Sequence, residues 1–194
     1  MKTDIILSGV GGQGILSIAT VIGKAALAEG LHLKQAEVHG MSQRGGDVQS
    51  NLRIGSEPIA SDLIPQGAAD IIVSLEPMEA LRYLPWLSKQ GWVITNTTPF
   101  VNIPNYPDAE ALDRELKALP HVVALDCDAI AKAAASPRAA NMVLLGAAAP
   151  FLGLTVEQLE QGIRDIFSRK GEAVVASNLA AFRAGYEQAN RQTK

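Results

Sequence analysis

The sequence predicts an α/β fold, in which a Rossmann-like, mostly parallel sheet is flanked by helices and followed by a helical C-terminal portion. Over the first 130 residues, short β-rich runs alternate with longer helical patterns, which is typical of a parallel sheet covered on both faces. After Asp126 the pattern is helical to the end. The 194 residues, 47% of them hydrophobic, suffice for one ordinary domain. We therefore expect one domain over 1–194, with its sheet core in about 1–130 and helices in about 131–194.

The sheet region begins with a strand, a glycine-rich turn and a helix. Strands are expected near Asp4–Gly9, His32–Val38, Ile71–Ser74, Val93–Asn96 and Val122–Ala124. The first helix should run from about Gln13 to Ala28, where Gly30 ends it. Its apolar residues recur at helical spacing and form one stripe: Ile15, Ala19, Ile22 and Ala26.

The segments after the second strand are less regular. Val48–Ile54 and Ile59–Leu63 are extended runs separated by a Gly-Ser pair, which predicts an additional hairpin. The proline-rich stretch Asn102–Asp108 is typical of a surface loop. The C-terminal helices are expected over Ala129–Ala135, Ala139–Phe151, Val156–Phe167 and Glu172–Ala189, the third of them opening with a capping box at Thr155 and Gln158.

Composition excludes several function classes. The formal net charge of −3 is spread along the chain, unlike the clustered basic surface of a nucleic-acid-binding protein. The apolar stretch Met142–Leu154 is broken by glycine and proline and is too short for a membrane helix. No basic and apolar leader precedes the first strand, so we expect a cytoplasmic protein. A single cysteine, Cys127, excludes an internal disulfide and a four-thiolate metal or iron–sulfur site within the chain. We expect it to be a small buried residue, and Trp86 and Trp92 to belong to the core or an interface.

Residues Gly9–Gly14, GVGGQG, fit the pattern G-x-G-x-x-G between a strand and a helix. Glycines allow a tight turn and a close ligand approach, and the first N–H groups of the helix favour a phosphate. The alternative is a turn that needs glycine for packing alone. Glu37 lies near the position where a dinucleotide enzyme binds the ribose, but a strand-end glutamate is more often solvated or paired. His39 is more simply explained as a hydrogen-bonded loop residue.

A complete NAD(P) oxidoreductase is not indicated. None of the three tyrosines is followed four residues later by lysine, so the Tyr-x-x-x-Lys pair of short-chain dehydrogenases is missing. No Ser/His/Asp or paired-carboxylate constellation is recognisable, and the three histidines lie in unlike contexts. As an isolated catalyst, the chain looks incomplete.

A second glycine-rich segment, GMSQRGG at residues 40–46, combines three glycines with a hydroxyl, an amide and Arg44. It can present backbone donors and one guanidinium at the carboxyl end of the sheet, which indicates a recognition loop. The alternative is a solvated loop without a ligand.

Together, GVGGQGI and EVHGMSQRGGDVQSNLRIG resemble the gamma subunit or domain of the 2-oxoacid:ferredoxin oxidoreductases, in particular the indolepyruvate type. The similarity extends nearly end to end through VITNTTP, NMVLLGAAAPFLGL and NLAAFRAGYE. The resemblance implies a subunit of an enzyme that decarboxylates an arylpyruvate, passes electrons to ferredoxin and forms an acyl-CoA.

The resemblance also implies how cofactors are divided. The chain lacks the Gly-Asp-Gly motif of thiamine enzymes and the cysteines of a cluster, so thiamine diphosphate, Mg²⁺ and [4Fe-4S] clusters are expected in a larger alpha subunit. CoA is a possible substrate at this subunit, and no residue is assigned a catalytic or metal-binding role. The two family loops correspond to Gly9, Gly11, Gly12, Gln13 and Gly14, and to Ser42, Gln43, Arg44, Gly45 and Gly46.

Two other functions stay open at this point: a self-contained NAD(P)- or CoA-binding module, and a protein-interaction scaffold whose glycine loops contact only protein. In isolation the chain is expected to self-associate, because a surface built for a partner tends to be apolar.

Arg44 gives the first testable prediction, since a guanidinium in a glycine-rich loop suits an anionic substrate group better than core packing. Arg44→Ala should change stability by no more than about 0.5 kcal/mol. It should lower kcat/KM of the assembled enzyme roughly 10- to 200-fold, about 1.5–3 kcal/mol for a charge-assisted bond. Arg44→Lys should restore part of this loss. Normal turnover by Arg44→Ala, or a failure of that variant to assemble, would contradict the role.

Overall fold

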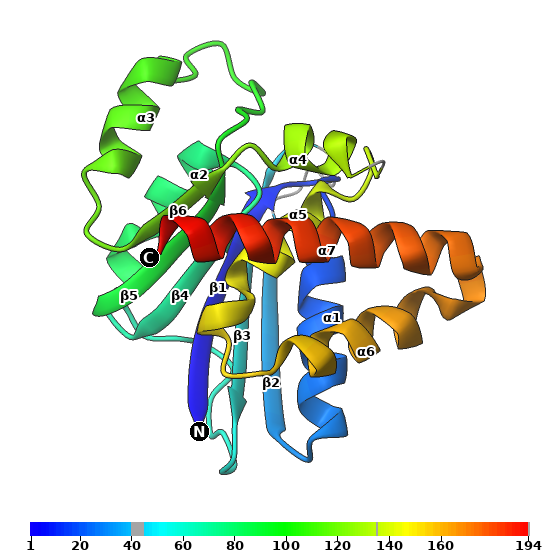
Figure 1. Ribbon diagram of the computed structural model, residues 1–194. Helices are drawn as coiled ribbons and strands as arrows, with labels where there is room; N and C mark the ends of the chain where they lie inside the picture. The colour runs from blue at the N-terminus through cyan, green and yellow to red at the C-terminus, as the bar shows by residue number, and fades with distance from the viewer. Residues whose placement is uncertain (40–44, 135, 194) are drawn as a thin grey trace.

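Over the described residues, 1–39, 45–134 and 136–193, the computed structural model contains one six-stranded sheet with strand order β2-β3-β1-β4-β5-β6 (Figure 1). The strands are β1 (Lys2–Val10), β2 (His32–His39), β3 (Asp47–Gly55), β4 (Ala69–Ser74), β5 (Leu87–Asn96) and β6 (Val122–Leu125). β1, β4, β5 and β6 pair in parallel, whereas β3 is antiparallel to both of its neighbours. The predicted fold class is confirmed.

Helices fill the connections and form the C-terminal portion. The α-helices are α1 (Ile15–Ala28), α2 (Pro77–Arg82), α3 (Ala109–Lys117), α4 (Cys127–Ala133), α5 (Ala140–Ala148), α6 (Val156–Phe167) and α7 (Glu172–Gln192). Short 3₁₀ turns are η1 (Leu84–Trp86), η2 (Ala149–Phe151) and η3 (Ser168–Lys170). The predicted capping box is present at α6, where Thr155 and Gln158 exchange side-chain and backbone hydrogen bonds. No helix in the described part of the chain is both long and apolar enough to cross a membrane.

The prediction of a hairpin between residues 48 and 63 is wrong. The first half is β3, but it pairs with β1 on one side and β2 on the other, so neither edge is free for a further strand. The second half is an irregular loop, because the Arg53 guanidinium binds the carbonyls of Ser61 and Leu63 at 3.1 and 3.0 Å. Pro58 and Pro65 flank this loop and cannot donate to a strand ladder.

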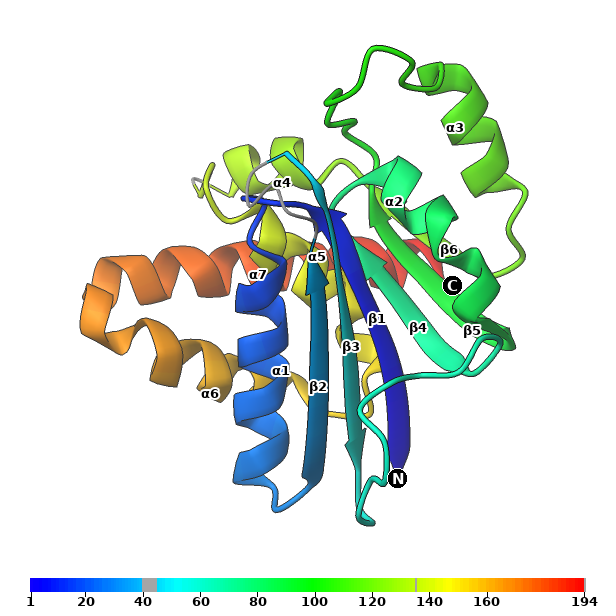
Figure 2. The same cartoon turned by 180° about the vertical axis from the view of Figure 1, so that it is seen from behind.

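The two faces of the sheet are covered by different helices. Alternate β1 residues Ile5 and Leu7 pack into the larger core, together with residues of α1, α5, α6 and α7. Ile6 points to the opposite face, where Ala80 of α2 and Leu116 of α3 complete a smaller core. In Figure 2, α2 and α3 lie over the β4–β6 side of that face, while the strands on the β2 side have no helix drawn over them.

A buried ion pair joins the sheet to its irregular loop. The Asp4 carboxylate is fully buried and accepts hydrogen bonds from Arg53 at 2.7 and 3.0 Å, while Lys2 lies 2.8 Å away. Burial alone would raise the pKa of Asp4, but the hydrogen bonds from Arg53 and Lys2 outweigh it and hold the pKa below its usual value. The same guanidinium also donates to the Ser61 carbonyl, so Arg53 links β1, β3 and the loop that follows β3.

Helices α5 and α7 approach each other through glycine. A Cβ atom at Gly146 would lie 1.9 Å from the Phe182 carbonyl oxygen, and one at Gly185 would lie 1.9 Å from the Val143 carbonyl oxygen. Both distances are far below van der Waals contact, so neither position accepts a side chain at this separation. The close approach buries Phe182 completely.

We predict that Gly146→Ala lowers the free energy of unfolding by about 2–3 kcal/mol, because the two helices must move apart to admit one methyl group. Urea unfolding measures this change. Gly23→Ala is the matched control, since its Cβ would meet only Leu33 Cδ1, at 3.2 Å, in the middle of α1. Gly23→Ala should leave the free energy of unfolding nearly unchanged. Alanine favours the helix by roughly 0.5–1 kcal/mol over glycine, and the tight contact with Leu33 offsets this gain. Equal stability of the two variants would contradict this account of the helix packing.

Candidate functional site

The two predicted glycine loops meet at the carboxyl end of β1. The Gly11 N–H donates to the Gly46 carbonyl at 2.8 Å, and the Gly45 N–H donates to the Gly11 carbonyl at 3.3 Å. The first loop and the last two residues of the second are thus brought together through their backbones. Ser42, Gln43 and Arg44 lie outside the described residues.

Gln13 occupies the inside of the first loop. Its Oε1 atom accepts a hydrogen bond from the Val10 N–H at 2.7 Å, and its Nε2 donates to the Leu75 carbonyl at 3.1 Å. A Cβ at Gly9 would lie 2.9 Å from that Oε1 atom, so Gly9 is needed to admit the glutamine. At this position the glycine serves packing, as the alternative interpretation of the motif proposed.

The end of the first loop is held by α5. Gly14 has φ +90° and is the N-cap residue of α1, a conformation that favours glycine. The Asn141 amide donates to the Gly14 carbonyl at 3.3 Å, and a Cβ at Gly14 would lie 2.7 Å from the Asn141 Nδ2 atom. Gly12, with φ +104°, is exposed, and a Cβ there would meet no atom of the described residues within 4 Å.

The first glycine loop and its surroundings differ in two features from a dinucleotide-binding site. The N–H groups of Val10, Gly11 and Gln13 are hydrogen-bonded within the protein, which removes them from the donors available to a phosphate. In addition, β3 separates β1 from β2, so Glu37 lies two strands from β1, roughly 10 Å at ordinary strand spacing. In the dinucleotide-binding fold these strands are neighbours. The loop therefore differs from a dinucleotide-binding loop in three of its N–H donors and in the place of the strand that carries the acidic residue.

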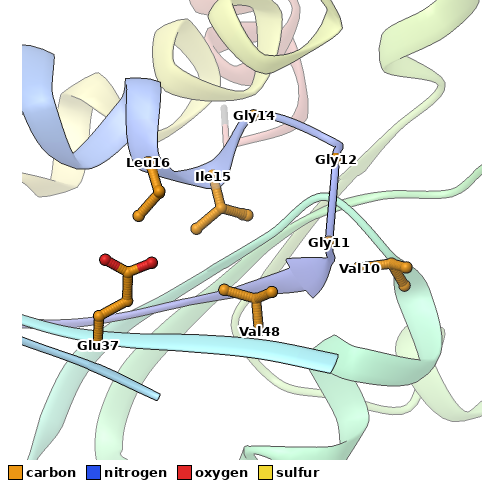
Figure 3. Close-up of a pocket in the computed structure, with 8 residues that line it drawn as sticks. All are labelled: Val10, Gly11, Gly12, Gly14, Ile15, Leu16, Glu37 and Val48. Atoms are coloured by element: carbon orange, nitrogen blue, oxygen red, sulfur yellow. The ribbon is translucent and has the colours of Figure 1, made fainter. Parts of the chain in front are cut away.

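A pocket of about 500 Å³ lies beside the first loop (Figure 3). Ile15 and Leu16 of α1 face Val48 of β3 and the Glu37 carboxylate of β2 across it, as Figure 3 shows. Glycine and aliphatic side chains make up most of the described lining, which suits an apolar or amphipathic group.

A second polar cluster at the same end of the sheet was missed by sequence reasoning. Glu76 follows β4 and is fully buried. Its Oε1 atom accepts hydrogen bonds from the Phe100 N–H, at 3.2 Å, and from the Tyr106 hydroxyl, while Oε2 accepts the Glu79 N–H at 2.8 Å. The Asn102 amide donates to the Gly45 carbonyl at 2.7 Å. Through these bonds the loop after β5 is attached both to β4 and to the second glycine loop.

The titratable groups of this cluster have shifted pKa values. Burial raises the pKa of Glu79, although its hydrogen bond with Arg82 acts in the opposite direction. Burial and the nearby Asp47 carboxylate raise the pKa of Tyr83 to about 12. Burial and the Glu76 carboxylate raise the pKa of Tyr106 as well. Both phenols therefore keep their protons at neutral pH and act as hydrogen-bond donors.

Cys127 is expected to be buried, and the two tryptophans are expected in the core or at an interface. Cys127 is fully buried, as expected, and burial with the adjacent acidic residues raises the pKa of its thiol. Trp92 stacks on His121 at a centroid distance of 5.0 Å and packs at a tilt against Phe151 at 4.5 Å, while Trp86 packs edge-on against Tyr83. Among the described residues, no three His, Cys, Asp or Glu side chains gather as they would around a metal ion.

Known proteins resemble the chain over nearly its whole length. Residues 4–188 match the family model described as "Pyruvate ferredoxin/flavodoxin oxidoreductase". The indolepyruvate oxidoreductase subunit IorB of Archaeoglobus fulgidus is 38% identical over 97% of this chain and 96% of that protein. The keto/oxoacid ferredoxin oxidoreductase gamma subunit of Geobacter sulfurreducens, a crystal structure, has a TM-score of 0.71 and 25% identity over 97% of this chain and 99% of that one.

A larger protein contains the same fold. The structure of 2-oxoglutarate:ferredoxin oxidoreductase from Magnetococcus marinus, with 2-oxoglutarate, coenzyme A and succinyl-CoA bound, matches 98% of this chain with a TM-score of 0.76 and 23% identity. The chain covers 31% of that protein's chain, so it spans about a third of that length.

Gln13→Ala tests the internal support of the first loop. The variant leaves the Val10 N–H without its acceptor and should lower the free energy of unfolding by about 1–3 kcal/mol. Thermal or urea unfolding measures this effect. Gln66→Ala, at an exposed loop position, is the control and should stay within about 0.5 kcal/mol of the parent. A Gln13→Ala variant as stable as this control would show that the glutamine does not hold the loop.

Proposed function

Because the chain belongs to the pyruvate ferredoxin/flavodoxin oxidoreductase family, we propose that it is the smaller subunit of an indolepyruvate-type 2-oxoacid:ferredoxin oxidoreductase. The observation that carries this proposal is the 38% identity to an indolepyruvate oxidoreductase subunit over nearly all of both chains. The match covers 97% of this chain and 96% of that subunit.

The proposed reaction is an oxidative decarboxylation. The bond between the carboxylate and the carbonyl carbon of an arylpyruvate breaks and CO₂ leaves. Two electrons pass to ferredoxin, and the acyl group forms a thioester with CoA as the CoA thiol releases its proton. We propose that this takes place in the cytoplasm.

The chain's own residues do not fit an iron–sulfur cluster. A [4Fe-4S] cluster is held by four thiolates, and this chain has one cysteine, which is buried and has a raised thiol pKa. We therefore assign the clusters, thiamine diphosphate and Mg²⁺ to a larger alpha subunit, which would also deliver electrons to ferredoxin. This chain supplies binding and positioning.

Within this division, the glycine loops form the candidate binding surface. The backbone bonds between Gly11, Gly45 and Gly46 and the Gln13 side chain support a rigid wall, and Gly12 leaves its outer side open. The adjacent apolar pocket suits an uncharged portion of CoA or of the arylpyruvate. We propose that Gly9, Gly14, Ser42 and Gln43 shape this wall and that Arg44 binds an anionic group of the same ligand.

The proposal predicts that the isolated chain contains no iron and does not catalyse arylpyruvate-dependent dye reduction. Activity should appear when the larger subunit is added and should increase with the amount of this chain until a fixed ratio is reached. Metal analysis and a viologen dye assay with indolepyruvate and CoA measure both properties. Stoichiometric iron in the isolated chain, or full activity of the larger subunit alone, would contradict the proposal.

A further inference from the structure

The loop between β5 and α3 carries an unusual exposed surface. We define the strap as residues 97–107, TTPFVNIPNYP, which contain no charged side chain. Three of its side chains are large, apolar and exposed, with exposed fractions of 43% for Phe100, 71% for Val101 and 37% for Ile103. Figures 1 and 2 show the segment projecting beyond the carboxyl ends of the strands, away from the helices of the larger core.

The strap is held in place from beneath. Its two ends converge on one buried acceptor, since the Phe100 N–H and the Tyr106 hydroxyl both donate to Glu76 Oε1. Between them, the Asn102 amide donates to the Gly45 carbonyl. Pro99, Pro104 and Pro107 further restrict the backbone. An exposed apolar surface on a preformed backbone loses little conformational freedom when a partner covers it.

Two observations indicate which partner covers this surface. The absence of charge excludes recognition by salt bridges and favours an apolar groove. The contact between Asn102 and Gly45 places the strap next to the candidate binding loops, so its partner lies beside the reaction site.

We infer that the strap is the docking surface for the larger subunit, which receives Val101 and its apolar neighbours in an uncharged groove. This inference rests on the proposed function. Docking at the strap would align the second glycine loop with the partner, because Asn102 joins the two through one hydrogen bond. Glu76 acts as a positioning residue, since it holds the strap from inside the protein without reaching the surface.

The experiment compares two single aspartates. Val101→Asp introduces a charge at the most exposed strap residue, whereas Leu27→Asp introduces one at a similarly exposed apolar residue, 59% exposed, at the C-terminal end of α1. In Figure 2 that end of α1 lies at the opposite end of the molecule from the strap. Affinity of each variant for the purified larger subunit is measured by isothermal titration, and folding is checked by thermal unfolding.

We expect Val101→Asp to raise the Kd of the complex at least about tenfold, since burying a charge in an apolar groove adds to the loss of the valine contact. Leu27→Asp should bind like the parent, and all three chains should unfold at similar temperatures. Binding of Val101→Asp with the parent's affinity would overturn the inference. If Val101→Asp binds the larger subunit unchanged but no longer self-associates, the strap is instead a contact with a second copy of this chain, which also overturns the inference. Absence of any complex with the parent chain would instead contradict the proposed function.

Discussion

The insertion of β3 between β1 and β2 is the constraint on which the candidate site depends. β3 pairs with β1 along its whole length, with Asp47 opposite Val10 at the carboxyl end of β1. The residues just before Asp47 must therefore lie beside those just after Val10. The hydrogen bonds between Gly11, Gly45 and Gly46 continue this ladder beyond the two strands. The pairing of β3 with β1 thus joins two glycine-rich segments into one surface, although a helix and a strand separate them in the sequence.

The same insertion changes what a familiar sequence motif can do. In a dinucleotide-binding fold, the glycine loop presents free N–H groups and the next strand contributes an acidic residue alongside. Here the second glycine loop and Gln13 use several of those N–H groups, and Glu37 lies beyond the inserted strand. The first loop thereby becomes a rigid protein surface, and the open side of the site is formed at Gly12 and in the apolar pocket next to it.

Much of the fold could be predicted from the sequence because its signals are local. The apolar strand runs, the stripe on α1 and the capping box of α6 each lie within one element. The partner of β3 could not be predicted in this way, since an extended run gives no information about which strands it joins. Glu76 was missed for a related reason. A glutamate between a strand and a proline is unremarkable locally, and its burial depends on Phe100 and Tyr106, which lie 24 and 30 residues further along. The glycine motifs were found from spacing, but the role of Gly9 emerged only from the position of Gln13.

The two outer strands of the sheet also differ in how their unpaired backbone is protected against aggregation. β6 is only four residues long, and the Gln192 amide at the end of α7 donates to its Ala124 carbonyl at 3.1 Å. β2 is twice as long and instead carries charged side chains such as Lys34 and Glu37, which oppose pairing with another chain. The last turn of α7 therefore shields one edge of the sheet. Chains shortened by a few C-terminal residues would lose that shield while keeping every strand, and their solubility would fall before their fold is lost.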